Sequence, residues 1–138
     1  MEETLRWDAP VQRTVRVPTT DVELAGVPVP RGSMILLFLA GANRDPLAFA
    51  DPGMFDLTRY DRTRDDQTRD DQSRAGDAEH LCFSAGIHYC LGAPLARLEG
   101  EVALRLLAER APRLRPAGAP VPRVATVLRG PLHLPVTA

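Results

Sequence analysis

The chain has 138 residues, the length of one domain, and its 44% hydrophobic and 25% charged residues exclude a mainly disordered or fibrous protein. The longest apolar run, Met34–Ala40, is far shorter than the ~20 residues that span a bilayer, and a net charge of −1 gives no basic field, so we expect neither a membrane nor a nucleic-acid partner. Cys82 and Cys90 are too few for a disulfide framework and no signal-peptide pattern opens the chain, so we expect a cytoplasmic protein with free thiols.

Short elements are expected along the first part of the chain, because 13 prolines and 10 glycines interrupt the sequence. Residues 2–7 are predicted to form a helix that ends before Pro10 and has no N-cap residue, as though the chain began inside an element. Alternating apolar residues predict short strands at 15–17, 22–24 and 27–29. Pro28 restricts its strand to an edge. The apolar run 33–39 fits a buried strand or the start of a buried helix, and 40–57 is expected to be rich in turns.

A charged pentapeptide repeat then interrupts the chain. Thr63-Arg64-Asp65-Asp66-Gln67 recurs at residues 68–72, and between Asp61 and Arg74 nine of fourteen residues are charged and none is apolar. An arginine-rich binding tract or an aspartate-based metal site is one interpretation. The alternating charges nearly cancel and the segment has nothing to bury, so we expect 61–74 to be a solvated, disordered insert.

An amphipathic helix is predicted from Pro94 to Arg110. Proline suits a first helical turn, and Pro112 ends the pattern. One apolar stripe runs along this helix: Leu91, Leu95, Leu98, Val102 and Leu106. Residues 121–136 are predicted to form two short strands around a turn.

The ten residues before this helix carry the chemistry. Cys90 lies close to the predicted helix N-terminus, where free N–H groups favour a thiolate. Gly86 and Gly92 permit the close approach of a flat ligand, and Phe83 supplies an apolar wall. His88 is placed to donate a hydrogen bond to an anionic group. A shielded thiolate of this kind suits an axial ligand to iron.

Two other interpretations of these residues compete. A lone cysteine is most often a small buried hydrophobe. His80, Cys82, His88 and Cys90 together are the right ligand types for a structural zinc site. Their spacing argues against zinc, because zinc motifs usually separate two ligand pairs by a long insert.

The decapeptide Phe83–Gly92 resembles the haem-binding signature of the cytochrome P450 family, Phe-x-x-Gly-x-His/Arg-x-Cys-x-Gly. Other segments resemble bacterial members in the same order, from the Glu-x-x-Arg of Glu3 to Arg6 through Asn43-Arg44-Asp45-Pro46 to Leu128-Arg129-Gly130-Pro131. The resemblance covers nearly all of residues 1–138 except the insert. It implies a mixed α/β fold, mainly α with small β-sheets, and the C-terminal, proximal haem-side part of the P450 domain.

The resemblance also implies a role for each matching residue. Cys90 is expected to be the axial ligand of the iron of haem b, iron protoporphyrin IX, as Cys is in this family. Phe83 is expected to shield the thiolate, while His88 and Arg16 meet the haem propionates. Glu3 and Arg6 are expected to form a buried structural ion pair. Residues 11–14 and part of 125–127 are expected near the substrate.

Three departures from the family pattern stand out. The family's third ion-pair residue is an arginine in Pro-x-Arg-Phe, but this chain has Met54 there, so we expect a less well satisfied Glu3–Arg6 pair. Ser84 replaces a common glycine. The family fold is also roughly three times longer, and we expect the absent upstream part to hold the distal helix that activates O₂, leaving no catalytic residue here beyond the haem ligand.

The function implied for a complete member is monooxygenation: one atom of O₂ enters a small organic substrate, with electrons from a ferredoxin or flavin-type partner. Arg97 is a candidate for contact with an acidic ferredoxin. With only this part present, we expect the apolar stripe to be partly uncovered. The alternative from another class is a non-catalytic remnant or interaction module that does not turn over; a small zinc-binding module is a weaker one.

Overall fold

The computed structural model describes residues 1–60, 78–123 and 127–138, so the charged insert 61–74 lies outside the described residues. Four helical segments and four two-stranded sheets make up these residues, as a mixed α/β class requires. The helical segments are α1 (Glu2–Trp7), α2 (Leu39–Ala42), the 3₁₀ turn η3 (Gly86–His88) and α3 (Ala93–Arg110), one of them a single turn of 3₁₀ helix. The strands are β1 (Thr14–Arg16), β2 (Val22–Leu24), β3 (Val27–Val29), β4 (Ile35–Leu37), β5 (Arg115–Pro116), β6 (Val121–Pro122), β7 (Pro131–His133) and β8 (Val136–Thr137).

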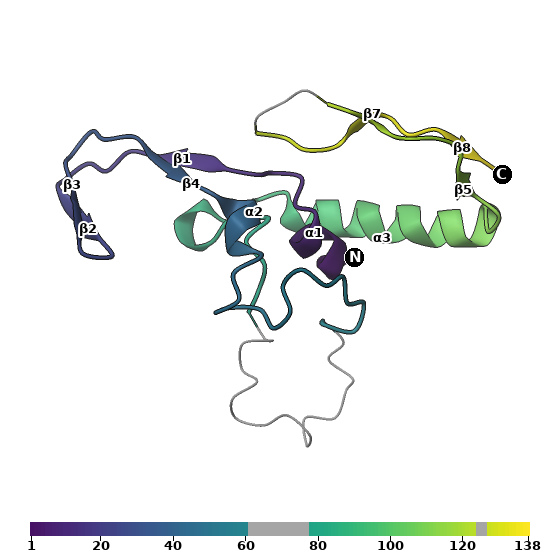
Figure 1. Ribbon diagram of the computed structural model, residues 1–138, viewed down its shortest axis with the longest axis horizontal. Helices are drawn as coiled ribbons and strands as arrows, with labels where there is room; N and C mark the ends of the chain where they lie inside the picture. The colour runs from purple at the N-terminus through teal and green to yellow at the C-terminus, as the bar shows by residue number, and fades with distance from the viewer. Residues whose placement is uncertain (61–77, 124–126) are drawn as a thin grey trace, which may run out of the picture.

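The first four strands form an antiparallel ribbon and a hairpin that extend away from the helices to one end of the molecule (Figure 1). β1 pairs with β4, and β2 pairs with β3 through the two-residue turn Ala25-Gly26. Both turn residues have positive φ, 50° and 80°, which matches the right-handed twist of a hairpin. Pro28 faces Glu23 in a two-stranded hairpin, where every strand is an edge. The predicted strands are confirmed, and the ambiguous run 33–39 contains β4 followed by the start of α2.

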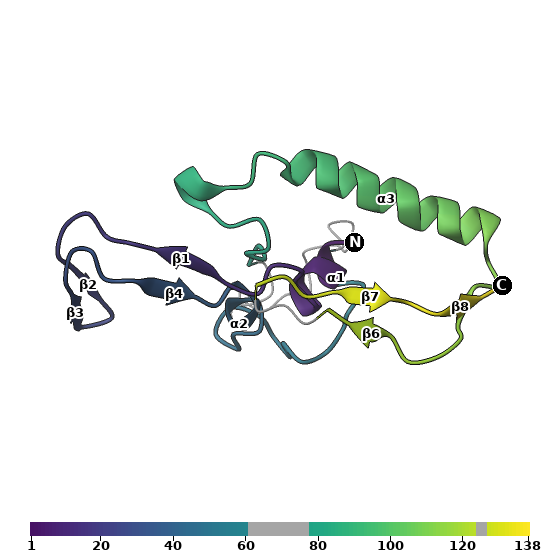
Figure 2. The same cartoon turned by 90° about the horizontal axis from the view of Figure 1, so that it is seen from above.

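Helix α3 is the longest element and confirms the predicted helix, beginning at Ala93 with Pro94 in its first turn. It runs toward the end of the molecule opposite the β2–β3 hairpin, with the C-terminus beside its last turn (Figures 1 and 2). Leu95 and Leu98 of the predicted stripe are 59% and 58% exposed, so this apolar face is uncovered, as expected. The tail forms β5 to β8, one pair of strands more than the sequence predicts.

The interior is small and unusually polar. Within the described ranges, five hydrophobic residues are buried, namely Ala9, Leu39, Phe49, Cys82 and Ala93. Four polar or charged residues are buried as well, namely Glu3, Arg6, Asn43 and His80. Arg6 and Asn43 are both 0% exposed, so hydrogen bonding rather than apolar packing joins α1 to residues 43–59. Among the residues that the structure describes, no helix is both long enough and apolar enough to cross a bilayer.

Candidate haem-binding site

A pocket of about 430 Å³ lies between α1, β1 and the cysteine loop, which we define as residues 83–92. It brings together four of the predicted site residues, Arg16, Phe83, His88 and Cys90. Its other lining residues are apolar or small polar ones: Leu5, Pro10, Val11, Thr14, Leu39, Cys82 and Ser84. Residues far apart in the sequence therefore meet around the Cys90 thiol. A larger pocket of about 830 Å³ is lined by Gln12 and Arg13, which belong to the segment expected near the substrate, but by none of the residues predicted to hold haem.

The backbone of the cysteine loop folds back on itself to present Cys90. The Cys90 N–H donates to the Phe83 carbonyl over 2.8 Å, and the Cys90 carbonyl accepts from the Ala93 N–H over 3.1 Å. Cys90 is exposed and lies three residues before the start of α3. Cys90 is thus close to the N-terminal, positive end of the helix dipole, which favours an anionic sulfur.

The two glycines of the loop serve different purposes. Gly86 has a φ of +59°, a conformation that other residues rarely adopt. A Cβ on Gly92 would lie 3.8 Å from the Cys90 sulfur, so the absence of a side chain keeps the approach to the thiol open. Gly92 itself has an ordinary φ of −82°. Because Gly86 and Gly92 have no side chains, a flat group can approach the backbone of the loop beside the Cys90 thiol.

Two basic side chains lie at the edge of this surface. Arg16 on β1 donates to Thr14 Oγ1 over 3.2 Å and to the Val15 carbonyl over 2.9 Å, and its other terminal nitrogen lies 3.4 Å from Ser84 Oγ. His88 is exposed at the end of η3. A thiol, an apolar wall, two glycines and two donors suited to carboxylates form a donor set that fits an iron porphyrin with propionate groups.

Ser84 occupies a conformation that explains why a glycine is common there. Its φ is +63°, which costs an L-residue about 1–2 kcal/mol. We predict that Ser84→Gly raises the free energy of unfolding by about 0.5–1 kcal/mol, measured by urea denaturation. Ser84→Ala keeps the strain and loses the contact with Arg16, so it should lower that free energy slightly. Equal effects of the two variants would contradict the strain argument.

Glu3 and Arg6 form the predicted ion pair, with Arg6 Nε 2.7 Å from Glu3 Oε2 and Arg6 Nη2 2.7 Å from Glu3 Oε1. The expectation that Met54 leaves this pair poorly satisfied is wrong. The other Arg6 donors bond to three carbonyl oxygens, those of Asn43, Pro52 and Met54, each at 2.9 Å. All five guanidinium donors therefore have acceptors, and Met54 contributes its carbonyl while its side chain is 63% exposed.

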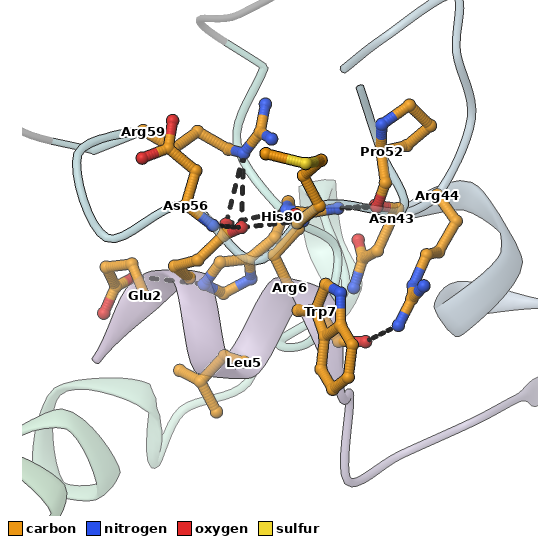
Figure 3. Close-up of polar contacts among 12 residues, drawn as sticks. Glu2, Leu5, Arg6, Trp7, Asn43, Arg44, Pro52, Asp56, Arg59 and His80 are labelled. Atoms are coloured by element: carbon orange, nitrogen blue, oxygen red, sulfur yellow. Dashed lines mark hydrogen bonds and ion pairs between the residues drawn. The ribbon is translucent and has the colours of Figure 1, made fainter. Parts of the chain in front are cut away.

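Arg59 is the site residue that the sequence reasoning missed. Its Nε lies 3.3 Å from Glu3 Oε2, and its side chain is 7% exposed (Figure 3). The Asp56 N–H donates to Glu3 Oε1 over 2.9 Å. Arg59 thus supplies a second cation to the Glu3 carboxylate, five residues beyond the position of the family arginine. The sequence offered little to predict this contact beyond an arginine just after the turn-rich segment 40–57. The contact itself depends on how residues 50–59 fold.

The pKa values of the two adjacent glutamates of α1, Glu2 and Glu3, indicate how the stability of the fold depends on pH. Burial raises the pKa of Glu2 and of Glu3, but hydrogen bonds and charges outweigh it and hold both pKa values below the usual 4.5. Arg97 and His80 act on Glu2, and Arg6, Asp56 and Arg59 act on Glu3. A lowered folded pKa stabilises the fold above about pH 4.5, and this contribution is lost as the pH falls through the folded value.

We therefore predict that Glu3→Gln lowers the free energy of unfolding most near neutral pH. The difference between wild type and this variant should shrink below about pH 4.5, where the protonated glutamate resembles glutamine. Urea denaturation at a series of pH values measures this difference. A difference that is constant, or that grows toward low pH, would contradict the lowered pKa of Glu3.

The structure does not assemble the alternative zinc site. Cys82 is buried, and its Sγ donates to the Leu5 carbonyl over 2.6 Å. Burial raises the pKa of the Cys82 thiol to about 11, although the hydrogen bond from Asn43 opposes this rise. In the described part of the chain, no three His, Cys, Asp or Glu side chains are grouped as metal ligands. Cys82 is a buried structural thiol, whereas Cys90 is the exposed one.

Arg97, the candidate for a partner surface, also makes intramolecular contacts, and its side chain is 35% exposed. Its Nε and Nη2 both bond to the Glu2 carboxylate, at 3.0–3.2 Å, and its Nη1 donates to the Tyr89 hydroxyl over 2.8 Å. Its guanidinium carbon lies 4.7 Å from the centre of the Phe83 ring. These contacts connect α1, the cysteine loop and α3.

Comparisons with known proteins agree with this geometry. A family model described as Cytochrome P450 matches residues 1–110. A putative cytochrome P450 140 of Mycobacterium tuberculosis is 50% identical over 137 residues, 99% of this chain and 28% of the relative. The 6-deoxyerythronolide B hydroxylase of Saccharopolyspora erythraea is 44% identical over 139 residues, 99% of this chain and 30% of that protein.

Solved structures give the same result. P450BioI, in complex with a hexadec-9Z-enoic acid ligated acyl carrier protein, superposes with a TM-score of 0.83 at 37% identity and covers 99% of this chain and 31% of that chain. Mycobacterium smegmatis CYP164A2 with econazole bound gives a TM-score of 0.80 at 38% identity, over 99% of this chain and 30% of the other. The chain therefore spans about a third or less of the proteins it matches.

Proposed function

The chain belongs to the cytochrome P450 family, and we propose that it is the proximal, haem-binding part of a haem-thiolate monooxygenase. The observation that carries this proposal is the pocket in which Arg16, Phe83 and His88 surround the exposed Cys90 thiol. A structural zinc site or a simple buried cysteine would not need that arrangement.

Each residue of the pocket has a distinct part in this proposal. Cys90, as a thiolate, would bind the haem iron, and Phe83 would shield the sulfur from water. His88 and Arg16 hold the two propionates at the edge. The sequence has no Cys-x-x-Cys-His motif for covalent attachment, so we assign haem b, held by its axial ligand and propionates. When bound, haem supplies the activation of O₂ for insertion of one oxygen atom into an organic substrate.

The complete reaction requires more chain than the 138 residues described, because the matched relatives are more than three times longer. For that complete reaction we propose a small organic substrate and a ferredoxin or flavin-type redox partner. Val11 and Thr14 line the pocket, and Gln12 bonds to the carbonyl of Val127 over 2.8 Å. Residues 11–14 and 127 are thus candidates for the substrate side; 125 and 126 lie outside the described residues. The two free thiols are in keeping with a cytoplasmic setting.

The decisive experiment is an absorption spectrum of the haem-reconstituted chain, reduced and then exposed to carbon monoxide. A strongly red-shifted Soret band is expected, because the thiolate pushes electron density onto the iron. Absence of haem uptake, or a band typical of a nitrogen or neutral-thiol ligand, would refute haem-thiolate binding by this chain. Thiolate binding without substrate oxidation in the presence of reductant and O₂ would favour the non-catalytic binding module.

A further inference from the structure

The adjacent glutamates of α1 bind two different parts of the chain. Glu3 binds Arg6 and the segment that carries Arg59. Glu2 binds His80 (Figure 3), and it also binds Arg97. Successive helical residues point about 100° apart, so α1 holds the segment that carries Arg59 with one carboxylate. With the other it holds His80 and Arg97, which flank the cysteine loop on either side. Neither Glu2 nor His80 belongs to the Glu3-x-x-Arg6 motif or to the decapeptide Phe83–Gly92.

The Glu2 carboxylate is held from two sides. The Cys82 N–H donates to His80 Nδ1 over 3.3 Å, so Nδ1 is an acceptor and the proton of the neutral ring lies on Nε2. His80 Nε2 then donates to Glu2 Oε2 over 3.0 Å, from a side chain only 2% exposed. Arg97 completes the set with its bidentate contact. Glu2 is therefore an anchored anion, and charge-assisted bidentate contacts of this kind are directional.

Arg97 extends this anchor into the cysteine loop on both sides of the thiol. It donates to the hydroxyl of Tyr89, the residue directly before Cys90, and its guanidinium lies over the ring of Phe83. Phe83 is also the residue whose carbonyl accepts the Cys90 N–H. The two residues that determine where the sulfur lies are thus both held by one side chain of α3.

We propose that Arg97, anchored on Glu2, is a positioning residue that holds Phe83 and Tyr89 and thereby orients the Cys90 thiol toward the haem. The effect on haem binding rests on the proposed function, but the ordering of the cysteine loop by Arg97 does not depend on haem. It also assigns Arg97 a role inside the protein rather than at a partner surface.

The test compares Arg97→Gln, Arg97→Lys and the matched control Arg105→Gln, an exposed arginine on the same helix. Hydrogen–deuterium exchange of the haem-free chain is followed by mass spectrometry for peptides covering 80–92 and for the β2–β3 hairpin. Arg97→Gln should accelerate exchange of the loop amides about tenfold, because losing a charge-assisted contact makes local opening easier. The hairpin and the Arg105→Gln chain should exchange as in wild type.

The second readout uses the haem-loaded chain. Arg97→Gln should lower the fraction of thiolate-type spectrum after reduction and carbon monoxide, and Arg97→Lys, which keeps the charge but loses the bidentate fork, should restore part of it. Unchanged loop exchange in Arg97→Gln, or equal acceleration in the loop and the hairpin, would overturn the proposal. If Arg97→Gln does not fold, Glu2→Gln provides the same comparison. A wild-type chain that takes up no haem would refute the proposed function, while loop exchange still decides the role of Arg97.

Discussion

Replacing Cys90 by serine is expected to abolish the strongly red-shifted Soret band of the reduced, carbon-monoxide-treated haem complex. The serine hydroxyl is not ionised near neutral pH and is a poor ligand for iron, so the electron donation of a thiolate is lost. Cys90 is exposed and its side chain packs into no core, so the fold should change little. The measurement is the spectrum together with far-ultraviolet circular dichroism of the same sample.

Cys82→Ser is the matched control, because Cys82 lines the same pocket but is buried and bonded to the Leu5 carbonyl. A serine hydroxyl can donate to that carbonyl as well, so this variant should keep the thiolate spectrum. Retention of the band in Cys90→Ser, or its loss in Cys82→Ser alone, would show that the wrong thiol has been assigned. Loss in both variants together with loss of helicity would indicate unfolding rather than ligand removal.

Replacing Arg6 by methionine is expected to cause the largest loss of stability, about 3–5 kcal/mol in free energy of unfolding. The change removes all five hydrogen bonds of a side chain that is 0% exposed. It leaves Glu3 buried with its main counter-ion gone and three carbonyl oxygens without their donor. Domains are stable by only about 5–15 kcal/mol, so much of the chain should be unfolded. Urea denaturation followed by circular dichroism measures the change.

Two comparisons separate this network from a general effect of losing an arginine. The exposed Arg31 is the control, and Arg31→Met should change the free energy of unfolding by less than about 0.5 kcal/mol. The double variant Glu3→Gln/Arg6→Met should cost less than the sum of the single changes, because each single variant already breaks the pair. If the effects of the two substitutions on the free energy of unfolding simply add, or if Arg6→Met has a small effect, then Glu3 and Arg6 are not energetically coupled as proposed.

The local elements and the cysteine loop were predictable because their determinants lie close together in the sequence. The helix 93–110 follows from its apolar stripe and Pro94, and the hairpin 22–29 from two alternating stretches around Ala25-Gly26. The predicted cluster around Cys90 rests on residues 83–92 and on one long-range match, Arg16. The pocket brings together four of the predicted residues, Arg16, Phe83, His88 and Cys90, and their roles toward haem stay predictions.

The partners of buried charges were not predictable from motifs. Because Met54 replaces the family arginine, the sequence predicted a poorly satisfied Glu3–Arg6 pair. In the structure, backbone carbonyls accept the remaining Arg6 hydrogen bonds and Arg59 contacts Glu3. Arg97 was considered only for contact with another protein, and its bond to Glu2, a residue 95 positions away in the sequence, was not foreseen. A side chain offers its donors to whatever acceptors the folded backbone brings near, and sequence spacing does not determine those acceptors.

The sequence by itself therefore determined the family and the local elements around Cys90, since motif residues and short-range periodicity are local properties. The assignment of Cys90 as the iron ligand stays a prediction. The tertiary structure decided which groups neutralise Glu3, which thiol is buried, and what Arg97 holds. The physical reason is that the cost of burying a charge depends on every donor within a few ångströms. Those donors come from α1, the segment 43–59, the cysteine loop and α3, which only folding brings together.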